Sequence, residues 1–119
     1  MERGIRNTIR EIVLRFRAKD IGFKRIKSGL KTVETRAATK KYRDFKAGDK
    51  LIFVCGNERF GRKITKVQHF GGIAAMLKKV PYKKINPLFI SLAAAKKIYY
   101  GYPGYKEKIK KFGIIALYI

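Results

Sequence analysis

The sequence is poor in the residues that build metal centres and disulfides. It contains one cysteine, Cys55, one histidine, His69, and no tryptophan. Zinc sites with four ligands in the usual cysteine and histidine forms are therefore excluded within one chain, and so is an intrachain disulfide. We predict no metal and no cofactor. Cys55 lies in the run LIFVC and is expected to be a small buried residue, and His69 is expected to be a structural histidine.

Long apolar segments are also lacking. The longest apolar runs lie within 88–95 and 113–119, and they are too short to cross a bilayer. The N-terminus carries charge, but no hydrophobic stretch with a small-residue cleavage site follows it. We therefore expect a cytoplasmic protein in a reducing compartment, without a membrane partner.

Acidic residues are scarce. Eight Asp and Glu stand against 30 Lys and Arg, which gives a formal net charge of +22. Ion-pair networks need both signs in quantity, so this excess predicts an external anion, and nucleic acid is the first candidate. The basic residues are spread through the chain, so the charge predicts RNA or DNA binding without locating the site.

The apolar content is that of a globular protein. The chain has 119 residues, of which 46% are hydrophobic and 13% aromatic, enough for one core. Residues 1–11 are polar and basic and are predicted to form an N-terminal arm. Residues 12–119 contain no repeat and no domain boundary, so we expect a single domain, and a monomer.

Alternation of apolar residues and the positions of glycine predict the order of elements. The predicted strands are 12–17, 32–36, 50–55, 60–70 and 113–119. The predicted helices lie between Asp20 and Gly29 and over 73–79, 88–100 and 106–112. In the strand 60–70 the inward parity shifts between Ile64 and Val67, which is typical of a bulge in a curved sheet.

The segment 26–36, IKSGLKTVETR, contains the residues with the clearest chemistry. Gly29 is predicted to end a short helix in the left-handed conformation, after which the chain becomes extended. With a period of two along a strand, Thr32, Glu34 and Arg36 share one face, and Val33 points to the other. Lys31 lies at the turn just before.

The spacing GxKxxExR in this segment resembles the signature of the ASCH family, a branch of the PUA-like superfamily of small β-barrels. The resemblance covers 12–119 and includes the stretches FKAGDKLIF, GRKITKVQHF, YYGYPGY and KFGIIALYI. It implies an α+β fold: a small mixed, mostly antiparallel β-barrel with peripheral helices.

The resemblance also implies a cleft between barrel and helices that is large enough for a nucleotide. Lys31 and Arg36 would bring positive charge to a phosphate, and Glu34 would accept hydrogen bonds from a base edge. We therefore expect an RNA-binding module for single-stranded RNA or structured RNA with exposed bases, with partners in the translation or transcription-coactivator machinery. The predicted RNA-binding residues are Lys31, Thr32, Glu34, Arg36, Tyr42 and Arg43.

Tyrosines offer two interpretations. Tyr42 lies on a basic loop next to the motif and is the better candidate for stacking on a base. The cluster Tyr99, Tyr100, Tyr102 and Tyr105 also has the π-faces on which bases stack, but tyrosines at a helix end more often pack with the hydroxyl reaching water.

A hydrolase is the alternative function. A bacterial branch with a similar motif consists of amidohydrolases that remove acetyl from N4-acetylcytidine, using a lysine, a threonine and a glutamate. The lysine falls on Lys31, but the threonine falls on Glu34, with Thr32 and Thr35 as neighbours. The glutamate has no counterpart in LFISLAAAKK. As an enzyme acting on a modified nucleoside or RNA, the protein would use Lys31 and Glu34.

Overall fold

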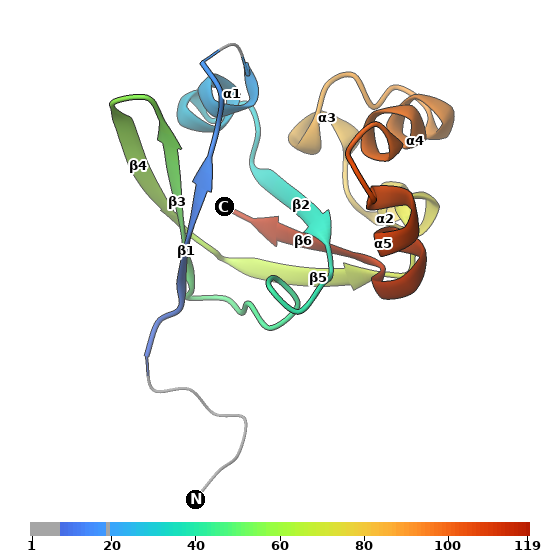
Figure 1. Cartoon of the computed structure of the whole chain (residues 1–119), viewed down its shortest axis with the longest axis horizontal. Helices are drawn as coiled ribbons and strands as arrows, with labels where there is room; N and C mark the ends of the chain where they lie inside the picture. The colour runs from blue at the N-terminus through green and yellow to red at the C-terminus, as the bar shows by residue number, and fades with distance from the viewer. Residues whose placement is uncertain (1–7, 19) are drawn as a thin grey trace, which may run out of the picture.

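The structure is a computed structural model of the chain, and it describes residues 8–18 and 20–119. These residues form six strands and five helices (Figure 1). The strands are β1 (Glu11–Arg15), β2 (Val33–Ala37), β3 (Lys50–Cys55), β4 (Glu58–Lys63), β5 (Lys66–Phe70) and β6 (Ile114–Tyr118). The helices are α1 (Gly22–Ser28), α2 (Ile73–Lys79), α3 (Tyr82–Ile85), α4 (Leu92–Tyr100) and α5 (Tyr105–Phe112). None of these helices has the length and apolar character needed to span a membrane.

The strands form two three-stranded sheets. The first sheet has the order β1-β3-β4 and the second has the order β2-β6-β5. β1 pairs with β3 in parallel, whereas the other three pairs are antiparallel. Both central strands, β3 and β6, carry consecutive buried residues, and β6 contributes to apolar clusters on both of its faces. The predicted α+β class and the central place of the last strand are confirmed.

Two apolar clusters hold the layers together. One lies between the second sheet and the helices and includes Ala116 and Met76, while the other lies between the two sheets and α1 and includes Leu117 and Phe53. Neighbouring residues of β6 thus point into different clusters, as strand alternation requires. Figure 1 shows the first sheet and helices α2 to α5 on opposite sides of the second sheet.

The chain passes from one sheet to the other between β4 and β5. The Ile64 N–H donates to the carbonyl of Asp49, whereas the next N–H, that of Thr65, donates to the carbonyl of Tyr118 in the second sheet. The shift of parity predicted between Ile64 and Val67 is therefore confirmed, but the single bulged strand predicted over 60–70 is wrong, because β4 and β5 are separate strands in different sheets. The parity shifts because the chain turns a corner there: residues before it pair in the first sheet, and residues after it pair in the second.

The predicted barrel is not formed by the described residues, because their strand pairings do not close. The β4–β5 corner joins the sheets along one seam only. Along the other seam β1 and β2 remain edge strands, and residues of both strands line a cleft. Of the predicted N-terminal arm, residues 1–7 lie outside the described residues, and Glu11 begins β1.

Two predicted helices differ at their starts. The helix predicted over 88–100 begins at Leu92, where the Ser91 hydroxyl accepts the Ala94 N–H at 3.0 Å and caps the first turn. Asp20 precedes α1 as predicted, but its carboxylate accepts the Gly22 N–H in a local turn, one residue before the cap position. The capping signals were therefore present in the sequence, and only the exact register was missed.

Candidate functional site

The local sequence fixes where β2 begins. Gly29 ends α1 with φ 87°, in the left-handed region where glycine has no Cβ penalty. The Lys31 N–H then donates to the Arg25 carbonyl of α1, and the Thr32 N–H donates to the Lys84 carbonyl of α3, both at 3.0 Å. Three elements are thus tied together at the entrance to β2, and the strand starts at Val33.

The two faces of β2 have different surroundings. Val33 and Ala37 belong to the cluster under the helices, and between them the Thr35 hydroxyl hydrogen-bonds the Tyr99 hydroxyl of α4. Glu34 and Arg36 point to the opposite face, as period-two alternation predicts. The predicted separation of Val33 from these two charged residues is confirmed.

A cleft with a volume of about 530 Å³ opens along β2, between the two edge strands. One wall comes from the end of β1 and from α1 with the turn before it. The other wall comes from the loop after α3 and from the facing ends of α4 and α5. Lys31, Glu34, Thr35 and Arg36 lie between the walls. Its volume is within the ~300–1,000 Å³ typical of small-molecule sites.

A buried charged cluster forms the base of the cleft. The Glu34 side chain is 3% exposed, and its Oε2 forms an ion pair with Nη1 of Arg36. Lys31 Nζ lies 3.5 Å from Oε1 of Glu34, too far for a good hydrogen bond, and donates instead to the Ile85 carbonyl at 2.9 Å. Two cations therefore surround one carboxylate, which leaves one positive charge in the cluster.

The surrounding charges decide the ionisation of Glu34. Burial alone would raise the pKa of the Glu34 carboxyl, but the charges of Arg36 and Lys31 outweigh it and lower the pKa below its ordinary value. Burial acts against the charged form of Arg36 as well, yet Glu34 raises the pKa of this guanidinium. Glu34 is therefore a carboxylate at neutral pH, able to accept hydrogen bonds but not to donate them.

Tyrosines line the wall beside this cluster. Tyr99, Tyr102 and Tyr105 all contribute to the cleft, and the rings of Tyr102 and Tyr105 meet edge to face with centroids 5.6 Å apart. The Tyr105 hydroxyl also accepts the Ala37 N–H at 3.4 Å, on the free edge of β2. Burial raises the pKa of Tyr99, so its hydroxyl stays protonated. Tyr102 is the most accessible of the three, with 52% of its surface exposed.

Basic residues stand at the opposite wall. Arg15 at the end of β1 and Arg25 on α1 line the cleft, together with Asp20. Counting Lys31 and Arg36, four cations and two carboxylates contribute to the lining. The cleft is therefore a net positive groove with aromatic side chains on its other wall, a combination that suits nucleotides.

The predicted site residues are only partly brought together. Lys31, Glu34 and Arg36 converge in the cleft, whereas Thr32 does not line it. Tyr42 does not line the cleft, but its ring centre lies 5.8 Å from the guanidinium of Arg36, which does. Arg43 is exposed and outside the cleft lining.

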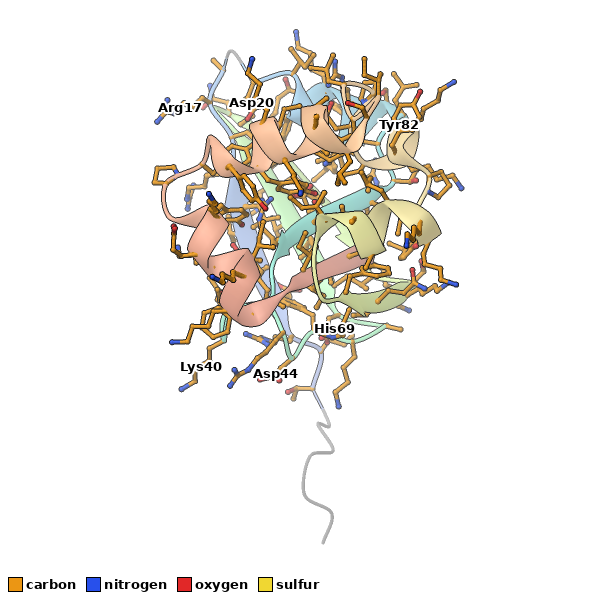
Figure 2. All side chains as sticks on the ribbon, turned by 90° about the vertical axis from the view of Figure 1, so that its right-hand side faces the viewer. Arg17, Asp20, Lys40, Asp44, His69 and Tyr82 are labelled. Carbon is orange, nitrogen blue, oxygen red and sulfur yellow. The ribbon has the colours of Figure 1, made fainter. Side chains whose placement is uncertain are left out.

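Figure 2 supports this division of the predicted residues. It shows Lys40 and Asp44, which flank Tyr42 and Arg43 in the sequence, at the end of the molecule opposite Asp20. Asp20 lines the cleft, so the basic loop lies mostly at the far end.

Several lining residues were not predicted. Thr35, Asn86 and Phe89 carry no local signal, because segments far apart in the sequence bring them to the cleft. Of the two interpretations of the tyrosines in YYGYPGY, packing is confirmed for Tyr99, and stacking on a base stays a prediction. Tyr99 packs in the core, while Tyr102 is exposed in the cleft.

The single histidine and cysteine lie elsewhere. His69 is exposed and lies at the end opposite Asp20 in Figure 2, so the expectation of a structural histidine among apolar residues is wrong. Cys55 is half-buried against the cluster between the sheets, and its thiol donates to the Arg17 carbonyl at 3.7 Å. Within residues 8–18 and 20–119, no three His, Cys, Asp or Glu side chains are grouped as metal ligands.

The described part of the chain is thus an α+β domain of two small sheets and five helices, with a charged cleft along one edge strand. Two solved structures share this fold. The crystal structure of hypothetical protein PH0355 matches with a TM-score of 0.73 and 25% sequence identity, over 90% of this chain and 96% of that chain. The solution NMR structure of protein PF0455 from Pyrococcus furiosus matches with a TM-score of 0.66 and 23% identity, over 90% of this chain and 94% of that chain.

No protein-family model and no curated protein matches the sequence. The names of the two similar structures assign them no activity, so the similarity supports the fold and leaves the function open. Membership of the ASCH family accordingly stays a prediction.

Proposed function

We propose that the cleft binds one unpaired nucleotide, and that the protein is an RNA-binding module for single-stranded RNA or structured RNA with exposed bases. The observation that carries the proposal is the buried cluster of Lys31, Glu34 and Arg36 beneath a tyrosine-lined cleft in a chain of net charge +22. A purely structural ion pair would need neither the cleft nor the aromatic wall.

Each wall has a suitable role. Tyr102 offers an exposed π-face on which any base stacks, and its edge contact with Tyr105 fixes the ring. Arg15 and Arg25 stand where phosphates would enter. The side chains of Lys31 and Arg36 are 16% and 25% exposed. They therefore act on a bound nucleotide more through their positive charge at the base of the cleft than through direct contact.

The ASCH resemblance belongs to this proposal. The motif GxKxxExR lies beside a cleft. The order of strands and helices follows the prediction except for barrel closure, the division of 60–70 into β4 and β5, and the additional helix α3. These features support the resemblance. The predicted partners in the translation or transcription-coactivator machinery and the predicted monomer are part of the same proposal.

The test must separate the cleft from the general attraction of a basic surface. Binding of fluorescent single-stranded and duplex RNA should be measured at several salt concentrations. Affinity should fall steeply with salt, by a slope of about 0.7 per neutralised phosphate in log units for a single strand, and single strands should be preferred in the cleft. Affinity that does not respond to salt would contradict phosphate binding.

Matched variants locate the binding. Tyr102→Ala removes the exposed ring in the cleft and should weaken single-strand binding by about 1–3 kcal/mol, the worth of one stacked base. Tyr100→Ala, at the same helix end but outside the cleft lining, should have little effect. Likewise Arg25→Ala should weaken binding more than Lys24→Ala, which removes the same charge from the same helix. Equal effects within both pairs would exclude the cleft as the site.

The hydrolase alternative is supported by one observation, the proximity of Lys31 and Glu34 at 3.5 Å. Two features weaken it: the lowered pKa makes Glu34 a poor base, and the Thr35 hydroxyl is already hydrogen-bonded to Tyr99. We expect no release of cytidine from N4-acetylcytidine. Turnover that disappears in Lys31→Ala would establish the alternative.

A further inference from the structure

One oxygen of Glu34 is left without a donor. Oε1 is buried, and no hydrogen-bond donor contacts it among the described residues. The other oxygen, Oε2, forms an ion pair with Arg36. The ammonium of Lys31 forms an ion pair with Oε1 at 3.5 Å, but its hydrogen bond goes to the Ile85 carbonyl. A buried carboxylate oxygen without a donor is costly, so a partner for it stabilises the site.

The missing donor can come from a ligand. Glu34 lines the cleft, and it is close enough to the tyrosine wall for its charge to contribute to the raised pKa of Tyr99 and of Tyr105. Because its carboxylate is ionised, a group that meets Oε1 must donate a hydrogen bond. A ligand that presented a carbonyl or a phosphate oxygen there would place two negative oxygens against each other.

We propose that Oε1 of Glu34 accepts a hydrogen bond from the exocyclic amino group of a base, so that the cleft prefers cytosine to uracil. This inference rests on the proposed function of the cleft. Cytosine carries an amino group where uracil carries a carbonyl, and the two bases have the same size and stack alike. The imino N–H of uracil lies between two carbonyl oxygens, which the carboxylate repels.

The first experiment changes only the ligand. The unmodified protein is titrated with pentamers of cytidine, of uridine and of N4,N4-dimethylcytidine at one salt concentration. Cytidine should bind about 5- to 150-fold more tightly than uridine, the range of one good base contact. The dimethylated pentamer has no amino hydrogen and should bind as weakly as uridine. Equal binding of all three overturns the inference.

The second experiment changes the acceptor. Glu34→Gln keeps the shape, adds a donor and should reduce the ratio of cytidine to uridine affinity toward one, with overall affinity unchanged or raised. The matched control is Asp44→Asn, which removes one negative charge at the end of the molecule opposite Asp20 (Figure 2) and should keep the ratio. Unchanged discrimination in a folded Glu34→Gln protein makes Glu34 a structural partner of Arg36 and overturns the inference.

The outcomes separate this inference from the function on which it rests. Failure of every oligonucleotide to bind overturns both. Binding that depends on Tyr102 but shows no preference between cytidine and uridine overturns only the inference. A deoxycytidine pentamer tests whether the donor is the ribose 2′-hydroxyl instead. If affinity falls when this hydroxyl is removed but not when the amino group loses its hydrogens, Oε1 accepts from the 2′-hydroxyl and the inference is wrong.

Discussion

Among single residues, Glu34 is central to the candidate site, because it is the buried carboxylate that pairs with both Lys31 and Arg36. Strand periodicity placed it on the same face as Arg36, and the structure confirms that arrangement together with Lys31. Sequence reasoning could reach this triad because its members are near neighbours in one segment. It could not reach the contact of Thr35 with Tyr99, since 64 positions separate these residues and only the packing of α4 joins them.

The charge of Glu34 should appear in the pH dependence of stability. Its folded-state pKa lies below the ordinary 4.5, so the ionised form contributes stability that is fully present above 4.5 and is lost as pH falls through the folded value. At neutral pH, Glu34→Gln leaves two cations without their counter-charge and should cost on the order of 3 kcal/mol. Urea unfolding between pH 2 and 7 measures both effects.

The comparison with the variant gives the sign. The stability difference between the parent and Glu34→Gln should shrink as the pH falls below 4.5, because protonation of Glu34 removes the charge that the variant lacks. The exposed carboxylate of Glu107 on α5 provides the control through Glu107→Gln. A difference that stays constant down to the acid end would contradict the coupling of Glu34 to its two cations.

At the level of elements, the turns that lead from helices into β2 and β6 determine where the strands beside the cleft begin. Gly29 joins α1 to β2, and Gly113 joins α5 to β6, both with positive φ. The sequence predicted both breaks, because a glycine follows each helical segment. The pattern could not predict that the two sheets stay open between β1 and β2, since the pairing of these strands depends on the packing of segments far apart in the sequence.

The two glycine junctions should differ in their tolerance to alanine. A Cβ at Gly29 would meet no atom within 4 Å, so Gly29→Ala should cost only the backbone strain, about 1–2 kcal/mol. A Cβ at Gly113 would lie 2.4 Å from the Phe70 carbonyl oxygen, so Gly113→Ala should add a steric cost and reach roughly 2–5 kcal/mol. Thermal and urea unfolding of both variants tests this order. Equal losses would mean that the α5–β6 junction relaxes freely.

For the whole molecule, net charge and fold make separate contributions to binding. The charge of +22 attracts any polyanion to the entire surface, whereas the cleft between the edge strands is a local feature of the fold. The amino-acid composition was sufficient to predict an anionic partner. The position of Tyr42 and Arg43 on a basic loop next to the motif also led us to predict that this loop is part of the site. The folded chain instead places tyrosines from α4 and α5 beside the motif.

The most direct test is a titration of the ¹⁵N-labelled protein with a cytidine pentamer, followed by amide chemical shifts at moderate salt. If the cleft is the binding site, the largest changes should fall on residues 31–37 and 99–105, with smaller ones on α1. The loop 40–44 and the β3–β4 hairpin, both basic but outside the cleft, should change little. Changes spread evenly over the lysine-bearing surface, with none concentrated on β2, would contradict the account.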